Sequence, residues 1–286
     1  MKMKMNLSPH PLKMAAVPDG AACYFCLGEE AEEEGMPLVR DCSCRGDSAG
    51  FAHFSCLTTY AEQKSKAAED GDMKTFAKPW NECNNCKQPF QGQLTVDLAS
   101  SFVSFAEATY GHPDNNKMDR MKVMVALRMN IVALLMSNDF SNEVANEKRR
   151  IIDNLLSMID QTKKDFNMSR WIHMPKDSEE YRYYNLLLGD YEGFAYEELG
   201  GVSVREISKN GKMIATTHLK KARAIYNLVD MKENVQLMDT KISMVNNAVV
   251  KNCVDGESVH PTMCAYTSSL LQDMKKSTKV SSTSPT

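Results

Sequence analysis

The chain has 286 residues, of which 43% are hydrophobic, and its formal net charge is −3. This length and composition suit one or two ordinary soluble domains. The near-neutral charge provides no basic field that would attract a nucleic acid, so we expect no nucleic-acid partner.

Residues 1–20 contain scattered methionines and lysines and three prolines, and they are predicted to form a disordered leader. The opening sequence MKMKMNLSPHPLK has no apolar core of the kind that makes a signal peptide. We therefore expect a soluble intracellular protein of the cytoplasm or the nucleus.

Seven of the nine cysteines and one histidine lie between residues 23 and 86, in four close pairs. The pairs are Cys23-x2-Cys26, Cys42-x-Cys44, His53-x2-Cys56 and Cys83-x2-Cys86. These eight soft or borderline ligands are enough for two four-coordinate zinc ions. Disulfide frameworks belong to secreted chains, and a redox motif is usually a single CxxC pair, so the pattern favours zinc.

The four pairs can bind two metals either in sequence or interleaved. The gap between the second and third pairs is short, whereas the loops 27–41 and 57–82 are long. In the interleaved arrangement, zinc ligands would hold each long loop at both of its ends. The spacing favours this arrangement, and the sequential one is the alternative. The interleaved sites would be Cys23, Cys26, His53 and Cys56 for the first zinc, and Cys42, Cys44, Cys83 and Cys86 for the second.

The ligand order, with cysteine fourth and histidine fifth, resembles a RING-CH (RING-variant) zinc finger. The segment 41–46 (DCSCRG) is similar to the C-x-C-x-G stretch of that family. The segment 50–57 (GFAHFSCL) is similar to its apolar–x–His-x2-Cys-Leu core, and 83–90 (CNNCKQPF) to its closing C-x-x-C-K-x-x-[FY] motif. The spacer between Cys56 and Cys83 is longer than is usual in the family.

This resemblance implies a small α+β, zinc-stabilised RING-like domain over residues 21–96, with two structural zinc ions. It also implies an E3 ubiquitin ligase that binds a ubiquitin-conjugating enzyme and ubiquitin and uses no covalent catalytic residue. Phe25 matches the apolar residue of the first zinc loop, and Leu57 and Tyr60 lie on one face of the helix expected after the third pair. Lys87 matches the place of a basic residue that hydrogen-bonds ubiquitin, while Asn84 replaces a common proline.

Helical periodicity dominates from about residue 97. Leu98, Phe102 and Phe105 fit one helix face, and residues 121–136 and 142–166 predict two further helices. The apolar run at 121–136 is too short and too interrupted by polar residues to cross a bilayer, so we expect no membrane span.

Residues 97–252 are predicted to form an all-α, TPR-like helical-repeat domain that binds a protein substrate. Tyr184 and Tyr226 begin similar segments 42 positions apart, and residues 218–226 (HLKKARAIY) look like a second TPR helix. The alternative is a helical bundle in which the similarity between these two segments is accidental. Gly200-Gly201 and Asn210-Gly211 predict turns, and residues 253–286 predict a mostly disordered tail.

Two other functions are compatible with the sequence. A PHD-like histone-tail reader would use Trp80, three residues before the last ligand pair, and the acidic residues between 29 and 34. A non-catalytic scaffold would bind partners through the helical domain and use the finger only as a folding module.

Overall fold

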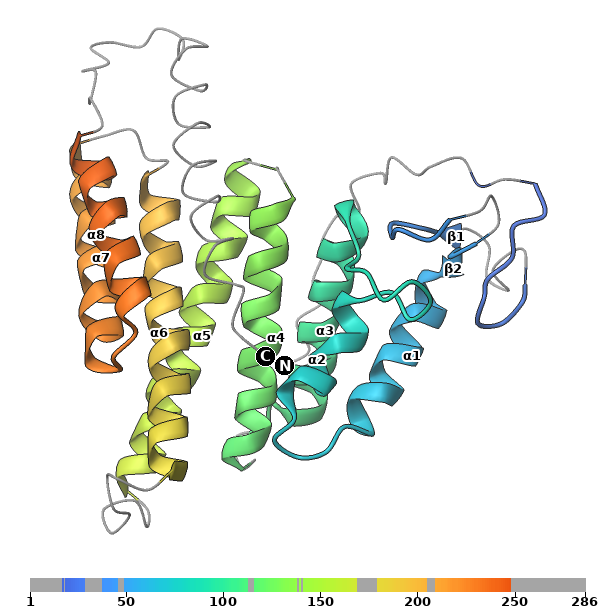
Figure 1. Ribbon diagram of the computed structural model, residues 1–286, viewed down its shortest axis with the longest axis horizontal. Helices are drawn as coiled ribbons and strands as arrows, with labels where there is room; N and C mark the ends of the chain where they lie inside the picture. Colours follow the sequence, from blue (N-terminus) through green and yellow to red (C-terminus); the bar gives the residue numbers. More distant parts are fainter. Residues whose placement is uncertain are drawn as a thin grey trace, which may run out of the picture. The chain divides into compact units, whose positions relative to one another are not determined.

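The computed structural model describes residues 17, 19–28, 38–45, 49–112, 116–137, 139, 141–168, 179–204 and 209–247. Within these residues it contains a two-stranded sheet and eight helices (Figure 1). The chain divides into two compact units, residues 1–139 and 140–286. The tail predicted at 253–286 and nearly all of the leader predicted at 1–20 lie outside the described residues.

The sheet and the first helix of unit 1 hold the finger together. Strands β1 (Leu38–Val39) and β2 (Ala52–His53) pair antiparallel, with Leu38 opposite His53 and Val39 opposite Ala52. Helix α1 (Phe54–Lys66) follows β2 directly, so the third ligand pair spans the junction of strand and helix. A small apolar core lies between these elements and the zinc loops; its buried aliphatic and aromatic members are Ala21, Leu38, Val39, Phe51, Ala52, Leu57, Phe90, Leu94 and Leu98.

The long spacer after α1 folds as a second helix, α2 (Met73–Asn81). Asp72 caps its N-terminus by accepting a hydrogen bond from the Thr75 N–H at 2.9 Å. Trp80 is 1% exposed and stacks on Phe102, with ring centroids 5.1 Å apart. Its indole N–H donates to Ser65 Oγ at 2.9 Å. The long spacer between Cys56 and Cys83 therefore packs the finger, through Trp80, against the next helix, which contains Phe102.

That following helix is α3 (Gly92–Tyr110), and α4 (Lys117–Met136) packs against it within the same unit. The predicted face of Leu98, Phe102 and Phe105 is buried, as expected. The limit predicted at residue 96 falls inside α3, because Leu94 and Leu98 belong to the finger core. Unit 1 accordingly continues beyond the finger to Asp139.

Unit 2 consists of α5 (Asn142–Met168), α6 (Glu179–Val204), α7 (Lys209–Leu228) and α8 (Lys232–Asn247). Successive helices pack together, and Figure 1 shows α6, α7 and α8 side by side. The two tyrosines of the predicted repeat, Tyr184 and Tyr226, are both buried. This all-helical arrangement is consistent with the TPR-like prediction.

Two predicted turns in unit 2 are wrong. Gly200-Gly201 lies inside α6, and Asn210-Gly211 lies in the first turn of α7. At Gly200 the missing side chain serves packing, because an added Cβ would lie 2.9 Å from the Leu219 side chain of α7. The glycine thus allows a close helix–helix approach and does not end the helix.

A buried ion pair connects α6 and α8. Lys241 donates to Glu197, and both side chains are only 4% exposed. Tyr226 of α7 donates to the other carboxylate oxygen at 3.2 Å. Buried charges of this kind require such partners, since an unpaired one would be strongly destabilising.

Across the ranges described above, no helix combines the length and the apolar character that crossing a bilayer requires.

The glycines of α6 provide a matched test of this packing. A Cβ at Gly193 would lie 2.7 Å from Cζ of the buried Tyr226, whereas one at Gly201 would meet only a Glu198 oxygen at 4.0 Å. We expect Gly193→Ala to lower the free energy of unfolding by about 1–3 kcal/mol through overpacking. Gly201→Ala should raise it by about 0.5–1 kcal/mol, because alanine is the better helix former. Denaturant unfolding followed by circular dichroism measures both, and equal effects of the two substitutions would contradict the packing.

Candidate metal centres and the adjoining surface

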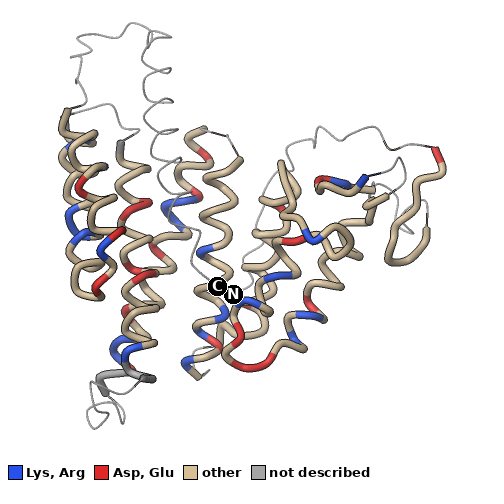
Figure 2. Tube along the Cα trace, in the orientation of Figure 1, with Lys and Arg blue, Asp and Glu red and all other residues tan. Residues whose placement is uncertain are grey.

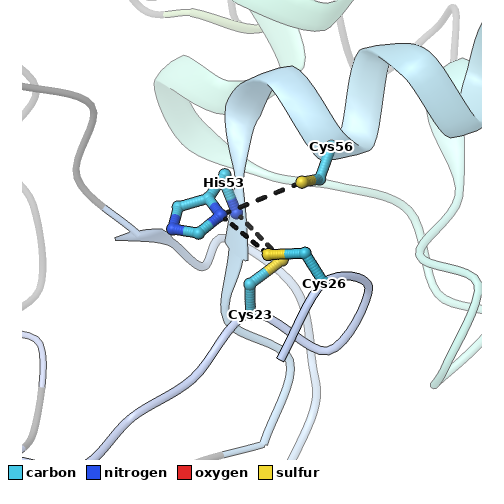
Figure 3. A group of neighbouring side chains, drawn as sticks. All are labelled: Cys23, Cys26, His53 and Cys56. Carbon is cyan, nitrogen blue, oxygen red and sulfur yellow. Dashed lines mark hydrogen bonds between the residues drawn. The ribbon is translucent and has the colours of Figure 1, made fainter. Parts of the chain in front are cut away.

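The first cluster joins Cys23, Cys26, His53 and Cys56, as the interleaved wiring predicts. Figure 3 shows the three sulfurs and the imidazole ring converging from the first zinc loop, β2 and α1. His53 Nδ1 lies 3.3 Å from Cys26 Sγ and 3.8 Å from Cys56 Sγ, so Nδ1 is the nitrogen that faces the cluster. The backbone N–H of His53 donates to Cys23 Sγ at 3.4 Å and so connects the strand to the first loop.

The second cluster joins Cys42, Cys44, Cys83 and Cys86. Cys44 Sγ and Cys83 Sγ are 3.7 Å apart, and Asn85 Nδ2 donates to Cys44 Sγ at 3.4 Å.

A glycine allows the chain to pass beside this cluster. Gly50 has φ +81°, and a Cβ there would lie 2.7 Å from Cys44 Cβ and 3.3 Å from Cys42 Sγ. Glycine therefore meets two needs at this position, a left-handed backbone and space for the ligands.

The geometry of both clusters fits zinc. The ligand atoms of each cluster lie within 4.8 Å of one another, and all seven cysteines are free thiols. A zinc–sulfur bond of about 2.3 Å in a tetrahedron gives sulfur–sulfur edges of about 3.8 Å, whereas a disulfide bond is about 2.05 Å long. The two clusters are thus two closed, four-ligand zinc sites whose wiring is interleaved.

Burial within the clusters raises the pKa of three of the ligand thiols, those of Cys42, Cys44 and Cys56. Burial raises the pKa of the Cys56 thiol to about 12, and the neighbouring Cys23 and Cys26 sulfurs act in the same direction. Burial likewise raises the pKa of Cys42 and of Cys44, to which the nearby Cys83 adds. These thiols would stay protonated at neutral pH by themselves, whereas zinc binds and stabilises the thiolate form.

The two CxxC loops have the same local structure. The N–H of Leu27 donates to the Cys23 carbonyl at 2.8 Å, and the N–H of Lys87 donates to the Cys83 carbonyl at 2.9 Å. Both residues after the second cysteine have a left-handed backbone, with φ 63° and 57°. This conformation is costly for a residue with a side chain, and it is used here twice to turn a pair of thiolates onto one metal.

A shallow hollow of about 310 Å³ adjoins the first zinc centre. Its walls come from the first zinc loop and the exposed face of α1, and its lining residues are Phe25, Cys26, Ser55, Cys56, Thr59, Tyr60 and Gln63. The rings of Phe25 and Tyr60 are 5.0 Å apart, centroid to centroid. Sequence reasoning missed Ser55, Thr59 and Gln63, although their spacing of four residues places them on the face of α1 that carries Tyr60.

The other predicted contact residues lie in different surroundings. Leu57 is 6% exposed and belongs to the finger core, so its side chain is not part of this surface. Lys87 is exposed, and its ammonium group donates to the backbone carbonyl and to Oδ1 of Asn84. Tyr60 donates to the same Oδ1 at 2.8 Å. Asn84, which replaces the usual proline, therefore connects α1 with the second CxxC loop.

These features define the class of protein: a small finger held by two interleaved zinc centres, followed by a helical region. The comparison with protein-family models gives the particular family of the finger, because residues 23–86 match the RING-variant domain. Members of this domain family are generally E3 ubiquitin ligases. No curated protein and no solved structure matches the chain.

Metal analysis of substituted chains tests the wiring. The wild-type chain should contain two zinc ions, and Cys42→Ser should lose the zinc of the second centre while the first is retained. Cys253→Ser is the matched control, since Cys253 lies outside the motif, and it should keep both. An elemental analysis that finds one zinc or none in the wild type would contradict the assignment.

Proposed function

We propose that this protein is a RING-CH-type E3 ubiquitin ligase. The observation that carries the proposal is the hollow beside the first zinc centre, because two neighbouring aromatic rings there offer an apolar anchor in a partly polar surface. Small protein contacts draw most of their energy from a few such anchors. The family of the finger supports a ubiquitin-conjugating enzyme as the partner.

In the proposed mechanism, the finger works by positioning. The conjugating enzyme carries ubiquitin as a thioester, and the finger binds the enzyme at the surface formed by Phe25 and Tyr60. Lys87 contacts the attached ubiquitin and restrains it, so that a lysine amine of the substrate meets the thioester in a reactive geometry. The zinc ions hold the two loops and take no part in the chemistry, since four protein ligands close each site.

The helical unit 2 provides a second proposed binding surface. Unit 2 is a separate compact body of stacked helices, and such stacks commonly form protein-binding surfaces. We assign to it the binding of a protein substrate or partner.

Trp80, on which the alternative of a PHD-like reader rests, is 1% exposed and stacks on Phe102 in unit 1, so its ring is not offered to a peptide. The acidic residues between 29 and 34, which were the other support for a reader, lie outside the described residues.

The central test is ubiquitin discharge. A panel of conjugating enzymes charged with ubiquitin is mixed with free lysine and the full-length protein, and loss of the thioester is followed in time. The proposal predicts faster discharge with at least one enzyme and loss of the effect after zinc chelation. If no enzyme responds, the non-catalytic scaffold becomes the better account.

Removal of the aromatic anchor should weaken binding of the conjugating enzyme. Phe25→Ala is expected to cost more than about 1 kcal/mol, the usual threshold for an anchor residue. Its zinc content should stay at two ions, because Phe25 is not a ligand. Leu228→Ala is a suitable control, since Leu228 is 81% exposed on unit 2. Titration calorimetry measures the affinities, and equal affinities for both variants would refute the assigned surface.

Lys87→Ala should separate binding from discharge. We expect the affinity for the conjugating enzyme to persist while the rate of discharge falls, because Lys87 is proposed to contact ubiquitin and not the enzyme. Lys74→Ala removes an exposed lysine of α2 and should leave the rate unchanged. A Lys87→Ala variant with the wild-type discharge rate would refute this role.

A further inference from the structure

The side chain of Asn84 accepts two hydrogen bonds from different parts of the finger. Tyr60 of α1 donates its hydroxyl to Asn84 Oδ1 at 2.8 Å, and the ammonium group of Lys87 donates to the same oxygen at 3.1 Å. Lys87 also donates to the backbone carbonyl of Asn84. A lysine ammonium group can only donate, so the side-chain atom that it meets is the amide oxygen, whose two lone pairs serve both donors.

The Lys87 side chain is held at its base as well as at its tip. Its backbone is left-handed, with φ 57°, and its N–H donates to the Cys83 carbonyl at 2.9 Å. A lysine side chain has large rotamer freedom, and ordering it for a partner costs entropy. Because Asn84 already holds the ammonium group, part of this ordering is complete before any partner binds.

The place at which this lysine is held matters, because the surrounding charge is mixed. Basic and acidic residues are interspersed along α1, α2 and the turn between them (Figure 2). A protein partner at the finger therefore meets individual charged groups there and not one broad field of a single sign. A well-placed lysine can then contribute more than an unplaced one.

The other donor to Asn84 belongs to the proposed enzyme-binding surface. Tyr60 lines the hollow beside the first zinc centre, and its ring lies 5.0 Å from that of Phe25. Asn84 thus connects a residue of the hollow with Lys87, the residue proposed to contact ubiquitin. A proline, which is common at this place in the family, has no side-chain acceptor and could not form the link.

We propose that Asn84 is a positioning residue for ubiquitin discharge, which holds the Lys87 ammonium group ready for the attached ubiquitin while Tyr60 anchors Asn84 to α1. The inference rests on the proposed function, because Lys87 can act only on ubiquitin that a conjugating enzyme brings to the finger. Groups that are in place before the reaction need no reordering during it. Loss of the Asn84 amide oxygen should therefore lower the rate of discharge by the bound enzyme and leave the affinity for the enzyme unchanged.

The test compares Asn84→Ala with Asn84→Asp and Gln88→Ala in the full-length zinc-loaded protein. The first change removes the acceptor, the second keeps acceptor oxygens, and the third removes an exposed side chain close by in the sequence. With the ubiquitin-charged enzyme fully bound, Asn84→Ala should slow discharge about 2-fold to 10-fold, the effect of losing one hydrogen bond. Asn84→Asp and Gln88→Ala should keep the wild-type rate, and failure of the aspartate to rescue would contradict the inference.

A double substitution gives a readout that a merely structural role would not move. If Asn84 acts through Lys87, Asn84→Ala should cause no further slowing in a chain that already carries Lys87→Ala. Two effects that multiply would show that the residues act independently and would overturn the inference. Faster discharge by Asn84→Ala would also overturn it, because Asn84 would then keep Lys87 away from ubiquitin.

NMR of the Lys87 ammonium group tests the link without any conjugating enzyme. The signal is assigned by its loss in Lys87→Ala, and its hydrogen exchange with water should be faster in Asn84→Ala than in the wild type or Gln88→Ala. Equal exchange in all three would refute the link. A wild type that discharges no ubiquitin would overturn the positioning role together with the proposed function, whereas a discharging wild type that Asn84→Ala leaves unaffected would overturn the positioning role alone.

Discussion

The interleaving of the two zinc centres is the constraint on which the finger depends. Each centre takes one CxxC pair and one pair from the middle of the motif, so that neither can form without closing a long loop. Loop closure costs conformational entropy, and in the described part of the finger it is offset by a two-stranded sheet, the helices α1 and α2 and a small apolar core. Metal binding at structural zinc sites contributes about 10–16 kcal/mol of apparent free energy in model peptides, which is enough to dominate this balance.

The zinc centres also determine where the proposed partner-binding surface lies. The hollow beside the first centre is lined by two of its ligands, Cys26 and Cys56. Of its two aromatic residues, Phe25 directly precedes Cys26 and Tyr60 follows Cys56 by four positions. Phe25 is therefore held by the first loop, and Tyr60 by a helix that starts at the third ligand pair. The Tyr60–Asn84 hydrogen bond extends the same surface to the second loop, where Lys87 lies. Rigid positioning of this kind is what the proposed ligase mechanism, which uses no covalent intermediate on the finger, requires.

The sequence predicted the ligands and most helices well because both depend on local spacing. Cysteine pairs separated by two residues, and apolar residues repeated every three or four positions, can both be recognised within a short stretch of sequence. Features that depend on tertiary contacts could not be predicted from the sequence. Leu57 and Trp80 are buried, and Gly200 of α6 allows close contact with Leu219 of α7. Asn84 looked like a mere departure from the family, but its hydrogen bonds to Tyr60 and Lys87 depend on residues brought together only by folding.

The most direct measurement of the central claim is a chemical-shift map. Isotope-labelled full-length protein is titrated with unlabelled conjugating enzymes, before and after zinc chelation. The account predicts that an active enzyme perturbs the resonances of residues 24–27 and of the exposed face of α1 around Thr59 and Tyr60, and that chelation abolishes the effect. Perturbations confined to α5–α8, or a map that survives removal of zinc, would contradict it.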